Sequence, residues 1–257
     1  MCLATTCRAM RDRLLNNCLV ALCLRLSCRN RLPSGGPPPI TARHQADSLK
    51  KEGIEPVVFA GFQDTVQTRQ IASDYDVIIH TADSFASDAC KAMIQGLADR
   101  QQKTGKETHF IHTSGTSSLG DRPVTGQYLE PRTFSDKNDI YSYECEREAR
   151  ESYIQRKTDV AVFETGVELG VKTYIVMPPS IFGIGRGLFN KLSIQAPTIL
   201  RSAIKAGQAE VIGDGKAQWD HVHIADLVLL YELILSKLLK LAHGKQGIFF
   251  AETGHHT

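Results

Sequence analysis

The sequence lacks the features that mark several large classes of protein. No apolar run approaches the ~20 residues that a membrane-spanning helix needs, so we expect no contact with a membrane. The formal net charge is only +2, which gives no indication of a nucleic-acid partner. The seven cysteines have neither the spacing of a zinc site nor the even number of a disulfide framework. These absences favour a globular protein that acts on a small molecule.

Acidic residues are almost missing from residues 1–36. Six arginines there are countered only by Asp12, and five of the seven cysteines fall in the same segment. Its apolar stretch 18–24 resembles the core of a signal peptide, whereas its arginine content is typical of an organelle presequence. A start that comes from a mistaken gene model is a third interpretation. We treat 1–36 as an atypical segment, disordered or non-native, and expect a cytoplasmic protein, or a mitochondrial one if 1–36 is a presequence.

Three hydrophobic segments are the most informative feature that is present. They span Asp76–Asp83, His109–Gly120 and Val171–Gly183, and each runs into small or hydroxylated residues. Short apolar runs rich in β-branched and aromatic residues are typical of buried parallel strands. Ligands of an open parallel sheet bind in the crevice outside the carboxyl ends of its strands. The pattern therefore predicts a nucleotide-binding α/β domain.

Strand and helix patterns alternate from residue 40 onward, which indicates a parallel sheet covered on both faces. We expect one large domain over 37–183 and a smaller, incomplete region on the substrate side over 184–257. The helix over 142–169 carries mixed charges, which we place on its exposed side. Expected strands cover 56–60, 76–80, 110–113, 172–177, 210–213 and 247–251, and expected helices cover 45–52, 64–73, 87–100, 142–169, 197–206 and 227–241.

Four motifs in order resemble the extended short-chain dehydrogenase/reductase family, the NAD-dependent epimerase/dehydratase group. They are the ends of the first two segments above, the turn 177–183 (Met-Pro-Pro-Ser-Ile-Phe-Gly), and 219–226 (Trp-Asp-His-Val-His-Ile-Ala-Asp). The resemblance covers roughly residues 40–254. It implies a Rossmann-like doubly wound sheet, NADP or NAD as cofactor, and oxidoreductase or epimerase chemistry on a small-molecule substrate. It leaves the substrate and the oligomeric state open.

One motif of that family is absent. A dinucleotide site needs a GxxGxxG turn, where backbone N–H groups approach the pyrophosphate at a helix N-terminus. No such motif precedes Ile40, and Gly35-Gly36 lies among prolines, which have no N–H to donate. The GxGxG sequence over 183–187 follows a late strand and is interpreted as a substrate-side loop. We therefore expect a sheet without its first strand and helix.

The family resemblance also implies the catalytic groups. Tyr153 and Lys157 match its YxxxK pair, in which tyrosine passes a proton and lysine lowers the tyrosine pKa, and Ser114 would hold the substrate. Alignment from the turn at residue 177 instead places Glu151 and Gln155 at the positions of that pair. Because two residues rotate a side chain by ~200° on a helix, Tyr153 and Lys157 could then face away from the cleft.

Cofactor contacts are expected at the strand ends. Arg43 and His44 follow the strand-like stretch Pro39–Ala42. The family resemblance puts them where NADP-preferring members carry a basic residue for the 2′-phosphate, and an exposed loop is the other interpretation. His221 and His223 have no evident third ligand, so no metal site is expected, and His255-His256 is interpreted as a mobile tail. The expected cofactor-binding residues are Arg43, His80, Thr81, Ala82, Asp83, Thr113, Ser114, Pro178, Pro179, Ser180 and Ile181.

Three hypotheses remain from the sequence. The chain is an NAD(P)-dependent enzyme, a family member that binds the cofactor without turnover, or a truncated product of an enzyme. The short distance from Glu252 to the end of the chain favours truncation, because related proteins usually continue further.

Overall fold

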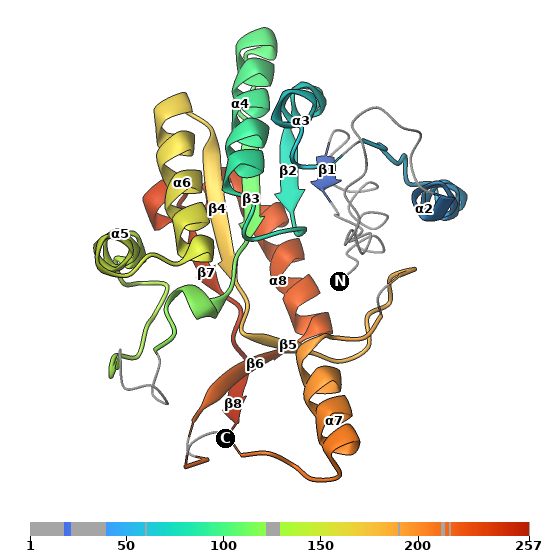
Figure 1. Cartoon of the computed structure of the whole chain (residues 1–257). Coiled ribbons are helices and arrows are strands. Elements are labelled where there is room, and N and C mark those ends of the chain that lie inside the picture. The colour runs from blue at the N-terminus through green and yellow to red at the C-terminus, as the bar shows by residue number, and fades with distance from the viewer. Residues whose placement is uncertain are drawn as a thin grey trace.

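The computed structural model describes residues 18–21, 40–59, 61–121, 129–189, 191–211, 214–215 and 217–256. A five-stranded sheet forms its centre, with strand order β1-β2-β3-β4-β7, and all of its pairs are parallel. Figure 1 shows the strands side by side, with their carboxyl ends directed toward the second sheet. The strands are β1 (Cys18–Ala21), β2 (Val77–His80), β3 (His109–Thr113), β4 (Lys172–Met177) and β7 (Ile248–Phe250).

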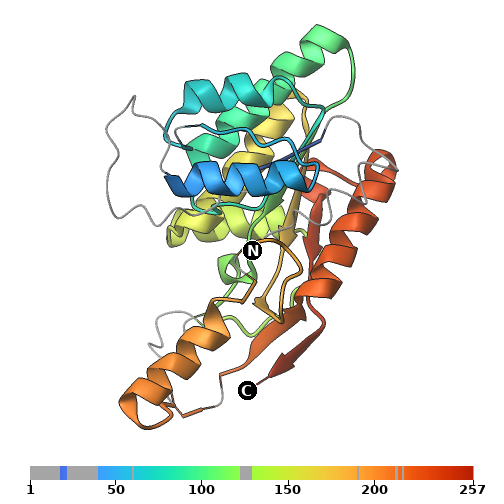
Figure 2. The same ribbon diagram turned by 90° about the vertical axis from the view of Figure 1, so that its right-hand side faces the viewer.

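Helices cover both faces of this sheet, as the alternating pattern predicts. On one face, Ile78, Phe110 and Ile175 pack with buried side chains of α4 and α6. On the other face, Ile111 and Tyr174 pack against α8, which Figure 2 shows across the sheet from α4 and α6. The helices are α2 (Ile40–Lys51), α3 (Thr65–Ala72), α4 (Ser87–Thr104), α5 (Ile140–Arg150), α6 (Ile154–Leu169), α7 (Gln195–Ala206) and α8 (Ile224–Lys237), with short 3-10 turns η1 (Thr116–Ser118), η2 (Leu238–Lys240) and η3 (Gly244–Gln246).

A smaller three-stranded sheet lies at the carboxyl ends of the main strands (Figure 1). It consists of β5 (Ser180–Phe182), β6 (Trp219–His223) and β8 (Gly254–His256), with β6 at its centre. β5, which lies just before the boundary expected at 183/184, pairs with β6 in this sheet. His255 and His256 pair with β6 rather than form a tail, so the prediction of a mobile terminus at these residues is wrong.

The start of the chain differs from the prediction. Cys18–Ala21 pairs in parallel with β2, next to the strand that resembles the fourth strand of the family. The first strand of a doubly wound sheet holds this place, so the expectation of a missing first strand is wrong. The other residues of 1–36, and any helix directly after β1, lie outside the described residues.

Three further predictions of secondary structure fail. Residues 56–59 are extended but pair with no described strand, residues 40–42 begin α2 rather than a strand, and 210–211 form no strand. The expected single helix over 142–169 is two helices, because Glu151 and Tyr153 are extended where α5 ends and α6 begins. The strands expected over 76–80, 110–113, 172–177 and 247–251 are confirmed, with each end within one residue of the prediction.

Candidate functional site

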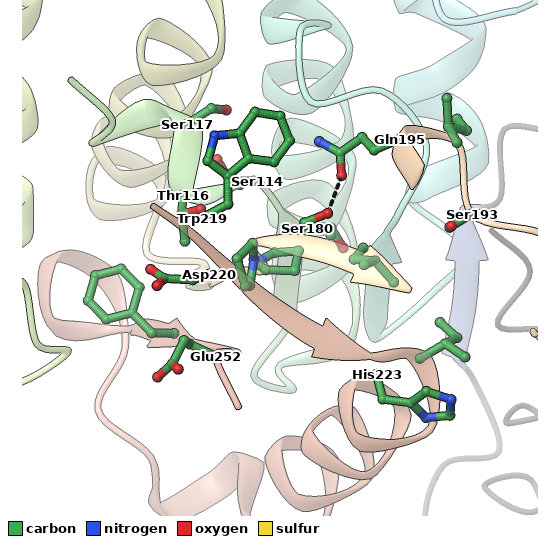
Figure 3. Close-up of a pocket in the computed structure, with 18 of the residues that line it drawn as sticks. Ser114, Thr116, Ser117, Ser180, Ser193, Gln195, Trp219, Asp220, His223 and Glu252 are labelled. Atoms are coloured by element: carbon green, nitrogen blue, oxygen red, sulfur yellow. Dashed lines mark hydrogen bonds between the residues drawn. The ribbon is translucent and has the colours of Figure 1, made fainter. Parts of the chain in front are cut away.

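A large open cleft lies between the two sheets, with a volume of about 2730 Å³. The loops after β2, β3 and β4 form one wall, and β5, β6 and α7 contribute to the other (Figure 3). The structure therefore confirms that Ala82, Ser114 and Pro179 meet at one edge. The expected cofactor residues that line the cleft are Thr81, Ala82, Thr113, Ser114, Pro178, Pro179, Ser180 and Ile181.

Three other expected cofactor residues do not line the cleft among the residues that the structure describes. His80 points from β2 into the layer between sheet and α4, because strand side chains alternate between faces. Asp83 accepts a hydrogen bond from the Phe85 backbone N–H at 3.0 Å and so shapes the loop instead. Arg43 lies in α2, and its side chain is outside the described residues.

Ser114 connects the cleft to a buried carboxylate. Its hydroxyl donates to Oδ2 of Asp159 at 2.6 Å, and Ser118 donates to the same oxygen at 2.9 Å. Asp159 comes from α6 and has no exposed surface. Burial raises the pKa of its carboxyl to about 7, although the two serine hydroxyls act in the opposite direction. Ser114 keeps 7% of its surface exposed and lines the cleft.

A second buried acid lies against Asp159. Glu144 of α5 is fully buried, and its burial together with the Asp159 charge raises the pKa of its carboxyl well above the usual range. Both carboxyl oxygens of Glu144 are buried without a hydrogen-bond partner among the described residues, so the neutral form of this carboxyl is favoured. The expectation that the mixed charges of this helical region face solvent is therefore wrong for Glu144 and Asp159.

Two buried arginines hold the loop after β3 against α5 and α6. Arg147 donates from Nη1 to the Leu119 carbonyl at 2.8 Å and from Nη2 to the Gly120 carbonyl at 2.6 Å. Arg156 donates from Nε to the Ser118 carbonyl at 2.9 Å. Both side chains are almost fully buried, and sequence analysis missed them. These contacts fix the backbone on which Ser114 is presented.

A histidine pair lies below the cleft. His80 and His112 are register partners on β2 and β3, and their Nδ1 atoms lie 3.0 Å apart. The Cys90 thiol of α4 lies 3.6 Å from the His80 Nδ1, so the three side chains offer ligand types that zinc accepts. Burial raises the pKa of the Cys90 thiol, which opposes the thiolate form that a metal needs. A hydrogen bond between neutral rings accounts for the distance between the two Nδ1 atoms.

Burial of His80 predicts a pH-dependent contribution to stability. Burial lowers its pKa to about 4, so below pH 6.5 the unfolded chain binds a proton that the folded chain does not. Stability from this group is therefore lost as the pH falls. Between pH 7 and about 4.5, we expect the native protein to lose about 2 kcal/mol more than His80→Gln in urea unfolding. The buried acids change the free energy of unfolding with pH in the opposite direction, but they do so in the native protein and in His80→Gln alike. The difference between the two proteins therefore reports on His80.

The exposed His44 provides a matched control for this measurement. His44→Gln should keep the pH dependence of the native protein. Equal losses for the native protein and His80→Gln would show that His80 takes up its proton in the folded state.

Neither residue of the expected catalytic pair, Tyr153 or Lys157, is among the described residues that line the cleft. Tyr153 precedes α6 in an extended conformation, and its hydroxyl donates to Ser117 at 3.3 Å. Lys157 is exposed, and Arg156 rather than Lys157 lies over the tyrosine ring at 5.7 Å. Gln155 lines the cleft, in agreement with the alternative alignment. Because Tyr153 lies outside the helix, the four-residue spacing does not place the pair on one helical face.

The opposite wall carries polar and aromatic groups. Ser180 donates to Oε1 of Gln195 at 2.9 Å, which ties β5 to α7, and Trp219 and Glu252 lie on the same side (Figure 3). The Nδ1 atoms of His221 and His256 lie 3.0 Å apart on neighbouring strands. Trp219 is half exposed and lines the cleft, so it can report on ligand binding.

Comparison with known proteins agrees with this geometry. The family described as NAD dependent epimerase/dehydratase matches residues 40–246, most of the chain. The chain belongs to this family. In the part of the chain that the structure describes, no helix combines the length and apolar character needed to cross a bilayer.

The individual proteins that resemble this chain share 25% or less of its sequence. The oxidase ucsJ of Acremonium sp. is 25% identical over 216 residues, which cover 78% of this chain and 61% of that protein. The chain thus spans about three fifths of the length of this curated relative. Among solved structures, a mutant of the UDP-glucuronic acid 4-epimerase of Bacillus cereus with bound NAD is similar to this chain, with a TM-score of 0.56 at 14% identity. The match covers 98% of this chain and 75% of the epimerase chain.

A dehydratase gives a similar result. A double mutant of the dTDP-glucose 4,6-dehydratase DesIV of Streptomyces venezuelae, solved with NAD, has a TM-score of 0.55 at 14% identity. The match covers 84% of this chain and 64% of the dehydratase chain. At these identities the two structures show that the fold is shared.

Proposed function

We propose that this chain binds NAD or NADP in the cleft and acts as an oxidoreductase or epimerase on a small molecule that carries a hydroxyl or carbonyl group. The observation that carries the proposal is the convergence of the ends of β2, β3 and β4 on one cleft of about 2730 Å³. This is the place where open parallel sheets bind nucleotides. Bound cofactor would accept or return hydride at its nicotinamide ring.

One unpaired hydroxyl supports the fit of the cofactor. Thr81 follows β2 and lines the cleft, and its Oγ1 is buried without a hydrogen-bond partner among the described residues. A buried hydroxyl without a partner costs free energy that a ribose hydroxyl would recover. Thr81 and Ala82 would hold the ribose, and Ser114 and Pro178–Ile181 would lie at the nicotinamide end. No described residue supplies the glycine turn for the pyrophosphate, so we expect weak affinity.

Titration with NADH and NADPH tests the proposal. Trp219 is the only tryptophan and lines the cleft, so energy transfer to a bound reduced nicotinamide should quench its emission in a saturable way. Ala82→Phe would fill the cofactor edge, and we expect it to weaken binding by about tenfold, or ~1.4 kcal/mol. Val167→Phe, at an exposed position on α6, is the control and should bind like the native chain. Absence of saturable quenching at millimolar NADH and NADPH would refute the proposal.

A second candidate is a family member that binds NAD(P) without turnover. It is favoured by the exposed Lys157 and by Gln155 at the cleft in its place. Nucleotide sugars such as UDP-glucuronic acid and dTDP-glucose are suitable first substrates, since the similar structures are enzymes of these compounds. Saturable NADH quenching with neither an altered sugar product nor net reduction of NAD or NADP would favour the non-catalytic candidate.

A further inference from the structure

We propose that Ser114 is the catalytic residue that transfers the substrate proton, and that Asp159 is the positioning residue that takes up this proton behind it. This inference deepens the proposed function and rests on it. Its basis is a hydroxyl that lines the cleft on one side and donates at 2.6 Å to a fully buried carboxylate on the other. Sequence analysis included Ser114 among the catalytic groups, as the residue that holds the substrate, and did not identify Asp159.

Backbone contacts fix Ser114 in this position. Its backbone N–H donates to the Val176 carbonyl at 2.9 Å, which continues the pairing of β3 with β4 by one residue. The Arg147 and Arg156 contacts hold the following turn. Ser118 donates to the same oxygen of Asp159, but it is fully buried and is absent from the described cleft lining. Of these two serines, only Ser114 can therefore reach a substrate.

Charged and titratable groups from the neighbouring helices and strands surround the Asp159 carboxyl and determine whether it holds a proton. Glu144 of α5 lies close enough for the Asp159 charge to raise the pKa of its carboxyl, and Oδ1 of Asp159 lies 3.6 Å from Nε2 of His112 on β3. Arg156 provides a positive charge, whereas Cys90 of α4 remains a neutral thiol. Burial lowers the pKa of His112 well below its usual value, so that imidazole is also neutral. The carboxylate therefore has no fully compensating cation and can accept a proton near neutral pH.

The proton step balances as follows. When a substrate alcohol is oxidised, its O–H proton passes to Oγ of Ser114 while the proton of Ser114 passes to Oδ2 of Asp159. The electron pair of the substrate C–H bond leaves as hydride to the nicotinamide dinucleotide, and a carbonyl forms. Reduction of a carbonyl runs through the same atoms in reverse. Serine is neutral before and after the step, so its own high pKa is not a barrier to exchange.

Tyr153 is the alternative proton carrier in the same chain. Its hydroxyl contacts Ser117 and lies 3.5 Å from the Gln155 side chain, and no buried base stands behind it among the described residues. Lys157 is exposed, and no hydrogen bond among the described residues joins it to this hydroxyl. The geometry therefore favours Ser114 over Tyr153.

The first part of the test needs no cofactor. Carbon-13 NMR of labelled aspartate should find one carboxyl that titrates near pH 7, from Asp159, and this signal should be missing in Asp159→Asn. Because both serine hydroxyls lower the Asp159 pKa, Ser114→Ala and Ser118→Ala should each raise it. An ordinary acidic titration for every aspartate would overturn the inference.

The second part measures turnover of UDP-glucuronic acid and dTDP-glucose with NAD or NADP. Ser114→Ala should lower kcat by about 100-fold or more, with unchanged NADH quenching of Trp219, and Ser114→Thr should restore part of it. Native kcat for oxidation should rise through about pH 7, and Asp159→Asn should abolish this rise. Ser118→Ala should reach the native maximum at a higher pH. Ser202→Ala, on the exposed side of α7, should match the native chain throughout.

Failure of the inference differs from failure of the proposed function. Loss of NADH quenching in the native chain would refute cofactor binding itself. Normal quenching with full turnover in Ser114→Ala, or with loss of turnover in Tyr153→Phe alone, would overturn the role of Ser114. Normal quenching without any turnover by the native chain would also overturn it, while cofactor binding would stand.

Discussion

Arg156→Met is expected to lower the free energy of unfolding by about 3–5 kcal/mol, the usual cost of removing one partner from a buried charged network. The Arg156 side chain is 1% exposed. It donates to the Ser118 carbonyl at 2.9 Å and to the Glu151 carbonyl at 2.7 Å. Its charge also compensates the carboxyls of Glu144 and Asp159. Methionine fills a similar volume but leaves these carbonyls without their arginine donor and the carboxyls without the nearby positive charge.

Urea unfolding measures this effect, and Arg150→Met is the matched control. Arg150 is exposed at the end of α5, so its replacement should change stability by less than about 0.5 kcal/mol. Equal stability of the two variants would show that Arg156 is dispensable and that the loop after β3 is held in another way.

Gly96→Ala is expected to destabilise the protein by about 1–3 kcal/mol through overpacking. An added Cβ would lie 2.3 Å from the Arg69 carbonyl oxygen and 2.6 Å from the Ala72 Cβ, because α4 packs directly on α3 at this point. Helix propensity alone predicts the opposite sign, a gain of about 1 kcal/mol. The sign of the change therefore decides whether the contact between the two helices is as close as the structure shows.

Thermal or urea unfolding of Gly96→Ala should be compared with Gln102→Ala. Gln102 is exposed on the same helix, so its replacement should be nearly neutral. A Gly96→Ala protein more stable than the native chain would contradict the packing of α3 on α4.

The sequence predicts the parts of the fold that depend on local pattern. Strands β2, β3 and β4 are continuous apolar runs, so their place in a buried parallel sheet can be recognised directly. The hydroxyls of Thr113 and Ser114 follow from this, because the ends of parallel strands meet at one edge. Residues 56–59 have the same local pattern but find no described partner strand, and pairing depends on the rest of the chain.

The buried charges could not be predicted in the same way. The region 142–169 carries mixed charges, which in most helices face solvent. Glu144 and Asp159 are buried because α5 and α6 pack together against the sheet and because two arginines lie with them. The sequence contains one indication of the buried Asp159. Alignment from the turn at 177 predicts that Gln155 faces the cleft, and Asp159 lies one helical turn further along the same side of the helix. The role of Tyr153 and Lys157 remains a prediction for the turnover experiments.

A crystal structure of the chain grown with NADH and NADPH tests the central claim most directly. The account predicts density for the dinucleotide across the ends of β2, β3 and β4, with the ribose at Thr81 and Ala82 and the nicotinamide ring between Ser114 and Pro179. Density for the dinucleotide elsewhere on the protein, or an empty cleft at saturating cofactor, would contradict it.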